Sequence, residues 1–578
     1  MNTAPLHRAL SLTAWIAGGF CLLLCAALVY EHFAAATNDP WKAPQLLALK
    51  DKLAAEPRNE AVQKEIRQLD QKLRRQTRLR LALDKSGAWL LLGGALALVL
   101  AAGQAAALRK TPALPQPKTD AGERSAKLAS RARRSLAGVA LAVAGGLVII
   151  RLVNPSVLPA HQAAGQKLPG AADAAEAPAE AAPALAELQT NWPRFRGWDG
   201  SGAAAQTNSG TNVVWRSPVP APGHNSPVVW GDRVFISGGT AAKREVFCYN
   251  VSTGALLWQR AVENVPGSPA KVPEVPEDTT YAASTLATDG RRVYAIFANG
   301  DLGAVNFDGS VAWTKYLGPL KNSYGYAASL ALWGTNLLVQ LDAGDTPEEG
   351  SKLISLQGAN GRLVWERSRP VSASWATPIV VEAAGKTQII TLSKPWVIAY
   401  APADGAELWR ADLLANEVVP SPVLAGGLVV LFNPGDKLLA LRPGGTGDVT
   451  KTGVVWTNEE NVPDIPSPAG CGDLVFTVTS MGMVKCFEAA DGKKNWETNL
   501  DAEVKASPGI AGDRLVVLSV DGLLVMLRAG RGLEEIGRSR LADKFIASPA
   551  FAGGRIFLRG TTNLYCLGPE NAQPAKQP

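Results

Sequence analysis

The chain has 578 residues, more than one hydrophobic core normally serves, so at least two structural regions are expected. Hydrophobic residues make up 47% and charged residues 19%, and the 56 Gly and 39 Pro indicate many turns, as in an all-β repeat fold. Much of the basic excess behind the net charge of +7 lies in residues 31–85 and 109–134, between apolar segments, so membrane topology explains it better than nucleic-acid binding does.

The first elements in chain order are apolar runs long enough to cross a bilayer as helices. Residues 9–30 and 86–108 carry no charged side chain and are 22 and 23 residues long. A third run, 136–153, is shorter and carries one arginine near its end, where the side chain can extend to the membrane interface. These runs predict a multi-pass α-helical region over residues 1–153, located in the inner membrane.

Basic residues set the predicted orientation of this region. The short loop 109–134 is rich in Lys and Arg and is therefore expected on the cytoplasmic side, which places everything after residue 153 outside. The arginines at the end of loop 31–85, which we expect to be helical, favour the opposite orientation. Residues 154–189 are rich in Ala, Pro and Glu and are predicted to form a flexible tether.

From about residue 190 one pattern recurs: an apolar strand, a short turn that ends in Gly, and a large residue four positions later, usually Trp. Gly accepts positive φ without steric cost, so each motif predicts a tight antiparallel hairpin. An indole at that place can pack between neighbouring units, so a structural role is expected. The predicted docking residues are Trp215, Trp258, Trp313, Trp365, Trp409, Trp456 and Trp496, with Gly254, Gly309, Gly361, Gly405 and Gly492 in the turns.

A second marker is a small hydroxyl residue, usually before Pro, that opens each unit. Eight such openings with four strands per unit are typical of a β-propeller. The last unit lacks one strand, which the segment VVWRSPV around Trp215 can supply to close the ring. We therefore predict an all-β, eight-bladed propeller of four-stranded antiparallel blades over residues 190–570, followed by a disordered tail at 571–578. The predicted openings are Ser226, Ser284, Ser329, Thr377, Ser421, Ser467, Ser507 and Ser548.

These repeats resemble the tryptophan-docking repeat of the pyrroloquinoline-quinone (PQQ) propellers, which the quinoprotein alcohol dehydrogenases share with the outer-membrane assembly lipoprotein BamB. The segment NWPRFRGWDGSG, residues 191–202, is similar to the start of PQQ-like propeller proteins. The family's frequent Asp before the turn is replaced by Asn250, Asn306, Gln357 and Glu488, a departure expected to alter the docking hydrogen bonds.

The resemblance implies two functions of different classes. A membrane-anchored scaffold that binds a protein or a ligand requires the ring and its loops alone, and is the favoured interpretation. The alternative is a PQQ-dependent dehydrogenase of an alcohol or sugar, with Ca²⁺ beside the cofactor and an Asp as base. The sequence lacks the adjacent Cys pair and the CxxCH haem motif that would favour this alternative.

A binding site is expected where the loops that lead into the innermost strands converge on the axis. No acid, base and nucleophile converge by spacing, so no catalytic residue is assigned. Asp342, in an acidic loop that follows a strand, is the candidate for a bound cation. The candidate contacts to PQQ or another ligand are His224, Asn225, Tyr281, Tyr326 and Trp375.

Three cysteines occupy one repeated inward strand position: Cys248, Cys486 and Cys566. No CxxC spacing occurs, so these residues are predicted to be buried thiols rather than disulfide or metal-binding groups.

Overall fold

The computed structural model describes Gly18 and residues 180–569, apart from 206–209, 270–272, 278, 347–348 and 460–462. Among these described residues, no helix has the length and apolar character needed to cross a membrane. The predicted spans 9–30, 86–108 and 136–153, the loop 31–85, most of the tether 154–189 and the tail 571–578 lie outside the described residues.

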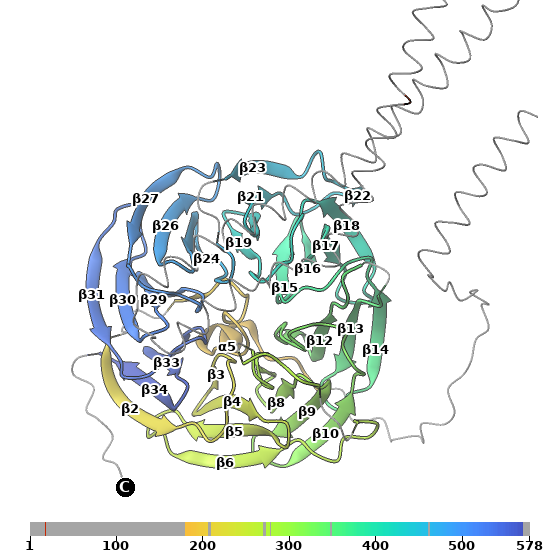
Figure 1. Ribbon diagram of the computed structural model, residues 1–578, viewed down its shortest axis with the longest axis vertical. Helices are drawn as coiled ribbons and strands as arrows, with labels where there is room; N and C mark the ends of the chain where they lie inside the picture. The colour runs from red at the N-terminus through yellow and green to blue at the C-terminus, as the bar shows by residue number, and fades with distance from the viewer. Residues whose placement is uncertain are drawn as a thin grey trace, which may run out of the picture. The chain divides into compact units, whose positions relative to one another are not determined.

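The described chain forms eight β-sheets, each with four antiparallel strands, and Figure 1 shows these sheets arranged as blades around one axis. The predicted all-β, eight-bladed propeller is therefore confirmed. The innermost strands of blades 1 to 8 are β3 (Val228–Trp230), β7 (Ala287–Thr288), β11 (Ala331–Trp333), β15 (Ile379–Ala383), β19 (Val423–Ala425), β24 (Ala469–Cys471), β28 (Gly509–Ala511) and β32 (Ala550–Ala552). The second strands are β4 (Arg233–Gly239), β8 (Arg292–Ile296), β12 (Asn336–Leu341), β16 (Lys386–Ser393), β20 (Leu428–Asn433), β25 (Leu474–Val478), β29 (Arg514–Leu518) and β33 (Arg555–Arg559).

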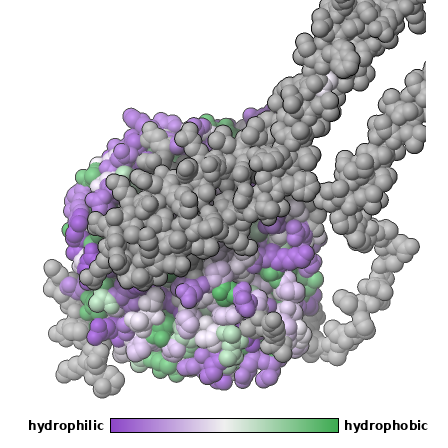
Figure 2. Space-filling model, viewed as in Figure 1, coloured by the Kyte–Doolittle hydropathy of each residue, from purple (hydrophilic) through white to green (hydrophobic). Residues whose placement is uncertain are grey.

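The second and third strands form the core, because their aliphatic and aromatic side chains on both faces are buried against the neighbouring blades. The third strands are β5 (Arg244–Asn250), β9 (Asp301–Asn306), β13 (Lys352–Gln357), β17 (Trp396–Tyr400), β21 (Lys437–Leu441), β26 (Met483–Glu488), β30 (Leu523–Arg528) and β34 (Asn563–Gly568). The outermost strands are β6 (Leu256–Ala261), β10 (Val311–Tyr316), β14 (Leu363–Ser368), β18 (Glu407–Asp412), β23 (Val454–Asn458), β27 (Lys494–Asn499), β31 (Glu535–Arg540) and β2 (Asn212–Pro218). Where Figure 2 shows the outer surface of the propeller, hydrophilic and hydrophobic residues are interspersed.

The ring is closed by pairing the two ends of the propeller. Strand β2, from the beginning of the domain, pairs antiparallel with β34, the last strand, so that Trp215 lies opposite Cys566. This pairing completes blade 8 and removes the free edge that β34 would otherwise present. The predicted closing strand is confirmed.

A closed ring of hydrogen bonds surrounds the axis. In each blade, the backbone N–H of the opening residue donates to the side-chain hydroxyl of the next blade's opening residue, at 2.9–3.0 Å. The residues are, in order, Ser226, Thr285, Ser329, Thr377, Ser421, Ser467, Ser507 and Ser548, which donates back to Ser226.

One member of this ring differs from the prediction. Blade 2 uses Thr285, whereas Ser284 was predicted; the Ser284 hydroxyl instead donates to the Ala328 carbonyl at 3.0 Å. Two adjacent hydroxyl residues open this blade, and no Pro follows Ser284 to mark the position, so the sequence alone did not fix the register.

Most docking tryptophans join a blade to the one that follows it. Each indole N–H donates at 2.8–2.9 Å to a backbone carbonyl in the next blade's outer turn, as Trp313 does to Gly358. A Cβ at Gly361, whose φ is +69°, would lie 2.7 Å from the Trp313 ring, so this glycine lets the indole lie against the turn. The other indoles that dock on a following turn are Trp215, Trp258, Trp365, Trp456 and Trp496, and the matching contact glycines are Gly254, Gly309, Gly405 and Gly492 for the first four.

The prediction that the residues replacing the family's Asp alter the docking hydrogen bonds is wrong. The acceptors are backbone carbonyls, such as Val251 and Phe307, which follow the substituted positions Asn250 and Asn306. The Asn250 side chain instead accepts hydrogen bonds from the N–H groups of its own turn. Side-chain identity at these positions therefore leaves the docking bond intact.

Trp409 departs from the docking pattern. Its N–H donates at 2.8 Å to Oε1 of Gln388, which lies in its own blade. Between β21 and β23, the third and fourth strands of blade 5, the chain forms a longer insertion, which contains strand β22 (Gly447–Asp448). This insertion replaces the glycine turn on which Trp409 would dock, and β22 pairs with β18 instead.

The segment NWPRFRGWDGSG crosses the inside of the ring, next to the short helix α5 (Leu185–Thr190) that Figure 1 shows at its centre. Trp192 pairs with Val229 of blade 1, and strand β1 (Ala203–Ala204) pairs in parallel with β28 of blade 7. Between them, Arg194 donates to the Pro378 carbonyl of blade 4. The chain's own backbone therefore fills part of the axial channel.

The three repeated cysteines are buried and free, as predicted. Burial raises the pKa of Cys248 and Cys566 to about 12 and that of Cys486 to about 11, so these thiols stay protonated at neutral pH.

Replacing one hydroxyl of the axial ring is expected to destabilise the propeller. Ser507→Ala removes the acceptor of the buried Ser467 N–H, which should lower the free energy of unfolding by about 1–3 kcal/mol. The exposed Ser252→Ala is the matched control and should change it by less than about 0.5 kcal/mol. Denaturant unfolding of the full-length chain measures both free energies. Equal effects of the two substitutions would show that the ring hydrogen bond adds nothing to the stability of the propeller.

Replacing a docking glycine separates steric conflict from backbone strain. Gly361→Ala places a methyl group against the Trp313 ring, whereas Gly385, with φ +72°, has open space around its Cβ position. Both substitutions carry the strain of a positive φ, and the first adds overpacking of about 1–3 kcal/mol. Thermal unfolding should therefore show a clearly larger loss for Gly361→Ala than for Gly385→Ala.

Candidate functional site

Two rims of the propeller need separate names. The entry rim carries the segments that lead into the innermost strands, residues 219–227 in blade 1, and the loops between second and third strands, residues 240–243 there. The hairpin rim carries the turns 231–232 and 251–255 of the same blade and their equivalents. The sequence-predicted site residues lie in entry-rim segments.

Asn225 is a structural residue that connects three blades. Its Nδ2 donates to the carbonyls of Ser237 and Ala282 at 2.8 and 2.7 Å, and its Oδ1 accepts from the Ser237 N–H. The same oxygen accepts from Arg559 at the end of β33 in blade 8. Asn225 is fully buried, so it offers no surface to a ligand.

Arg559 is a buried cation that the sequence did not reveal. Its guanidinium donates to Asn225 and to the carbonyls of Ser237 and Ala221, and no carboxylate among the described residues forms an ion pair with it. Burial lowers its pKa to about 9. Backbone carbonyls thus replace a counter-ion and hold blade 8 to blade 1.

His224 and Tyr281 occupy half-buried positions beside this cluster. The backbone N–H of His224 donates to the Ala282 carbonyl at 3.1 Å, and the Tyr281 side chain lies against Gly239, where an added Cβ would be 3.0 Å from the Tyr281 Cβ. Both residues therefore belong to the contact between blades 1 and 2.

Tyr326 lies in the entry-rim loop 317–330, and Trp375 contacts the same loop. The Tyr326 hydroxyl donates to the Gly318 carbonyl at 2.7 Å, and burial raises the pKa of this tyrosine. The Trp375 indole donates to Asn322 Oδ1 at 2.7 Å and packs edge-on to Tyr324 with ring centroids 4.9 Å apart. The polar atoms of both side chains thus stabilise the loop.

Asp342 belongs to a buried ion pair. Both side chains of the pair are fully buried; Arg369 Nε lies 2.9 Å from Asp342 Oδ1, and Gln340 donates to Oδ2 at 2.6 Å. Burial raises the pKa of Asp342 to about 6, although Arg369 acts to lower it. A guanidinium therefore occupies the position beside this carboxylate where the candidate cation was expected.

Several residues predicted to contact PQQ or a cation have partners within the protein. Asn225, Tyr326 and Asp342 already use their polar atoms in contacts within the protein. Among the residues that the structure describes, no three His, Cys, Asp or Glu side chains gather as metal ligands. These three side chains contribute to the fold, and PQQ or Ca²⁺ binding by the predicted residues stays a prediction.

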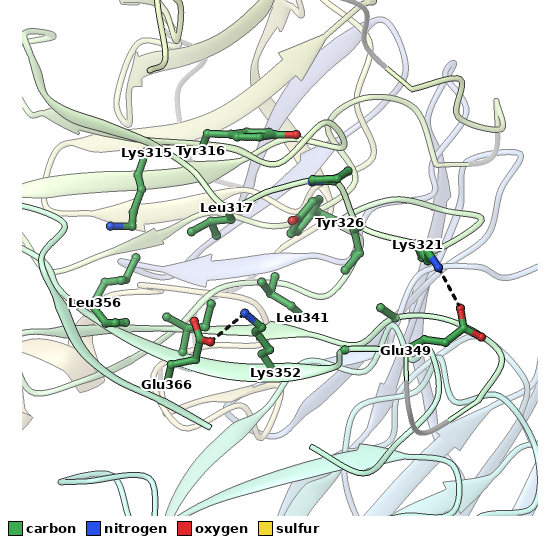
Figure 3. Close-up of a pocket in the computed structure, with 16 residues that line it drawn as sticks. Lys315, Tyr316, Leu317, Lys321, Tyr326, Leu341, Glu349, Lys352, Leu356 and Glu366 are labelled. Carbon is green, nitrogen blue, oxygen red and sulfur yellow. Dashed lines mark ion pairs between the residues drawn. The ribbon is translucent and has the colours of Figure 1, made fainter. Parts of the chain in front are cut away.

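A cavity of 420 Å³ lies between blades 2 and 3, and Figure 3 shows it between β10 on one side and β13–β14 on the other. Its volume falls within the roughly 300–1,000 Å³ typical of ligand pockets. The apolar lining comes from the entry-rim loop that joins blade 2 to blade 3 and from three strands of blade 3, and it includes Leu317, Leu320, Tyr326, Leu341, Ile354 and Leu356.

Charged side chains surround this apolar lining. Lys321 pairs with Glu349 at 3.7 Å and Lys352 with Glu366 at 2.8 Å, as Figure 3 shows. Lys315 donates to the Gly361 carbonyl at 3.2 Å. Three lysines against two glutamates leave one excess positive charge, so the pocket suits an apolar group that carries negative charge beside it.

Sequence reasoning found one of these pocket residues, Tyr326, and missed the rest. The lining comes from β10, the following loop and β12 to β14, so it forms through lateral packing of two blades. No spacing within one repeat signals such a pocket. The lysines that flank it, such as Lys315 and Lys352, are unremarkable charged residues at strand ends in the sequence.

The comparisons with known proteins are consistent with this fold. The sequence profile of the family described as "Outer membrane protein assembly factor BamB" matches residues 200–379, 350–468 and 445–534, which together are more than half of the chain. A solved europium-containing methanol dehydrogenase superposes with a TM-score of 0.52 and 12% identity, over 66% of this chain and 92% of that one. At this identity, the structural likeness establishes the fold alone.

Two curated relatives are similar over part of their length. Tetrathionate hydrolase of Acidithiobacillus ferrooxidans is 22% identical over 253 residues, which are 42% of this chain and 48% of that protein. The outer membrane protein assembly factor BamB of Moranella endobia is 20% identical over 182 residues, which are 31% of this chain and 41% of that protein. The chain thus spans less than half of either relative.

Removing Asp342 tests whether it serves an ion pair or a cation site. Asp342→Ala leaves the buried Arg369 charge uncompensated, which should lower the free energy of unfolding by about 3–5 kcal/mol. Asp345→Ala, in the same acidic loop but exposed, is the control and should cost less than about 0.5 kcal/mol. A small effect of Asp342→Ala in metal-free buffer, with Ca²⁺ stabilising the wild type alone, would restore the cation interpretation.

Proposed function

The chain belongs to the family described as outer membrane protein assembly factor BamB, and from that premise we propose that it is a membrane-anchored binding scaffold. The apolar runs 9–30, 86–108 and 136–153 form the anchor in the inner membrane, and residues 154–189 connect it to the propeller. The propeller lies on the extracytoplasmic side, as the basic loop 109–134 favours.

The pocket between blades 2 and 3 carries this proposal. It combines an apolar lining with charged groups at its mouth, which is the composition of a site that takes an anchoring side chain of a protein partner. The entry-rim candidates Asn225 and Trp375, in contrast, are used in contacts between blades. A lateral binding site therefore fits the described residues better than an axial cofactor site.

The alternative function is a PQQ-dependent oxidoreductase that acts on an alcohol or a sugar. A solved methanol dehydrogenase has a similar fold, so this fold is compatible with the alternative function. Dye-coupled alcohol oxidation by the purified full-length chain, with PQQ and Ca²⁺ added, distinguishes the two functions. Saturable turnover would replace the scaffold proposal.

A charge placed in the pocket should abolish partner binding. With a photo-crosslinking amino acid at the exposed Lys321 position, the full-length chain in its own membranes should form one specific protein adduct. Leu320→Glu puts a carboxylate among the apolar lining residues, so the adduct yield should fall at least tenfold, equivalent to about 1.4 kcal/mol of binding free energy.

The matched control is Leu533→Glu, the same substitution at an exposed leucine of blade 7. It should leave the adduct unchanged. An adduct that survives Leu320→Glu, or that both variants lose equally, would contradict binding in the pocket.

A further inference from the structure

The outermost strand of each blade has one edge that faces away from its sheet. In the described part of the chain, one outermost strand, β18 of blade 4, has a further strand on its outer edge. This added strand is β22. Strand β10 stands at the end of its sheet, which is ordered β10-β9-β8-β7, and no described strand pairs with its outer edge. Unpaired N–H and C=O groups along such an edge are a template for another extended chain.

The pairing of β22 with β18 shows how an extended segment binds at this edge. The two strands run parallel, with Trp409 opposite Gly447. The Val449 N–H donates to the Arg410 carbonyl at 2.8 Å, and the Asp412 N–H donates to the Thr450 hydroxyl at 2.8 Å. The carbonyl one residue after the tryptophan and the N–H three residues after it thus supply the pairing atoms.

Strand β10 presents the same atoms in the same register. The Leu317 N–H donates to the Gly300 carbonyl inside its blade, as the Leu413 N–H does to Pro395 after β18. Because successive residues of a strand alternate, the Thr314 carbonyl and the Tyr316 N–H point away from β9. They correspond to the Arg410 carbonyl and the Asp412 N–H.

The pocket distinguishes the edge of β10, because Lys315 and Tyr316 of this strand form part of the pocket wall (Figure 3). Lys315 reaches the Gly361 carbonyl of blade 3, on the same face as the Trp313 indole. A strand added beside β10 would therefore direct alternate side chains toward blade 3 and the pocket.

We propose that the partner binds by adding an extended strand to the outer edge of β10, parallel to it, and inserting one large apolar side chain into the pocket between blades 2 and 3. This inference rests on the scaffold function and specifies its partner. The partner carries an acidic residue two positions before and two positions after the inserted side chain. Residues at that spacing lie on the same face of a strand, where they would face Lys315, Lys321 and Lys352.

A synthetic peptide tests this recognition without knowledge of the natural partner. The probe is the acetylated, fluorescently labelled heptapeptide Thr-Glu-Thr-Phe-Thr-Glu-Thr, in which Glu, Phe and Glu share one face of a strand. Fluorescence anisotropy with the purified full-length chain should show saturable binding. Replacing Phe by Thr, or both Glu by Lys, should weaken binding at least tenfold.

Strand pairing is tested by deleting one backbone donor. Tyr316→Pro removes the outward N–H and the ring, whereas Tyr316→Ala removes the ring alone, so the proline variant should bind the peptide at least tenfold more weakly than the alanine variant. Asn499→Pro is the control for proline on an edge strand, because the Leu500 N–H donates to Gly482 as Leu317 does to Gly300. It should bind like the wild type.

A peptide N-methylated at its three central residues gives a second readout that leaves the protein unchanged, and it should also bind at least tenfold more weakly. Equal binding of the Tyr316→Pro and Tyr316→Ala variants together with undiminished binding of the methylated peptide would overturn strand pairing. Absence of peptide binding to the wild type would overturn it as well. The scaffold function fails separately, if the chain with the photo-crosslinking residue at Lys321 and no other change forms no specific protein adduct.

Discussion

The closed ring of eight hydrogen bonds between opening residues is the constraint on which the propeller depends. Each blade must place one hydroxyl and one backbone N–H at the same height around the axis, because each group is the partner of the next blade's group. All eight pairs are buried, so an interrupted ring would leave an unpaired N–H without access to water. Serine and threonine meet this requirement since their short side chains accept without filling the narrow inner space. The ring thus fixes the spacing of the blades at the axis.

The tryptophans fix the same blades at their outer ends, and the exceptions follow from topology. An indole docks where the next blade has a turn that joins its third and fourth strands. Blade 8 has no such turn, because β34 and β2 come from opposite ends of the domain, and blade 7 carries Ile536 where the other blades carry Trp. Blade 5 replaces the turn by an insertion, and Trp409 of blade 4 then bonds to Gln388 within its own blade. The blades that depart from the docking pattern are therefore those next to the ring closure and next to the insertion in blade 5.

The sequence predicted the architecture well because periodic markers report on every blade. The glycine hairpins and hydroxyl openings gave the number of blades, and Trp215 ahead of the first opening identified the closing strand. Ser284 was wrong by one position because two hydroxyls are adjacent there and spacing cannot choose between them. The site was less predictable, since a rim position says nothing of a side chain's partners. Asn225 and Asp342 are bound by Arg559 and Arg369, which lie 334 and 27 residues away in the sequence.

The proposed binding site at the side of the ring agrees with how this chain fills its centre. The segment from Trp192 to β1 crosses the inner space and forms hydrogen bonds with blades on opposite sides, including those of Arg194 and Arg196 to backbone carbonyls. Burial lowers the pKa of these arginines to about 10 and 9, so their placement is costly and must be compensated by the contacts that they make. A centre that is partly filled in this way leaves less room for a ligand that would lie over the axis. The outer edges of the blades remain, and blade 4 shows that such an edge accepts an extended segment. The pocket beside the outer edge of β10 combines outward-facing backbone groups with an apolar volume next to them.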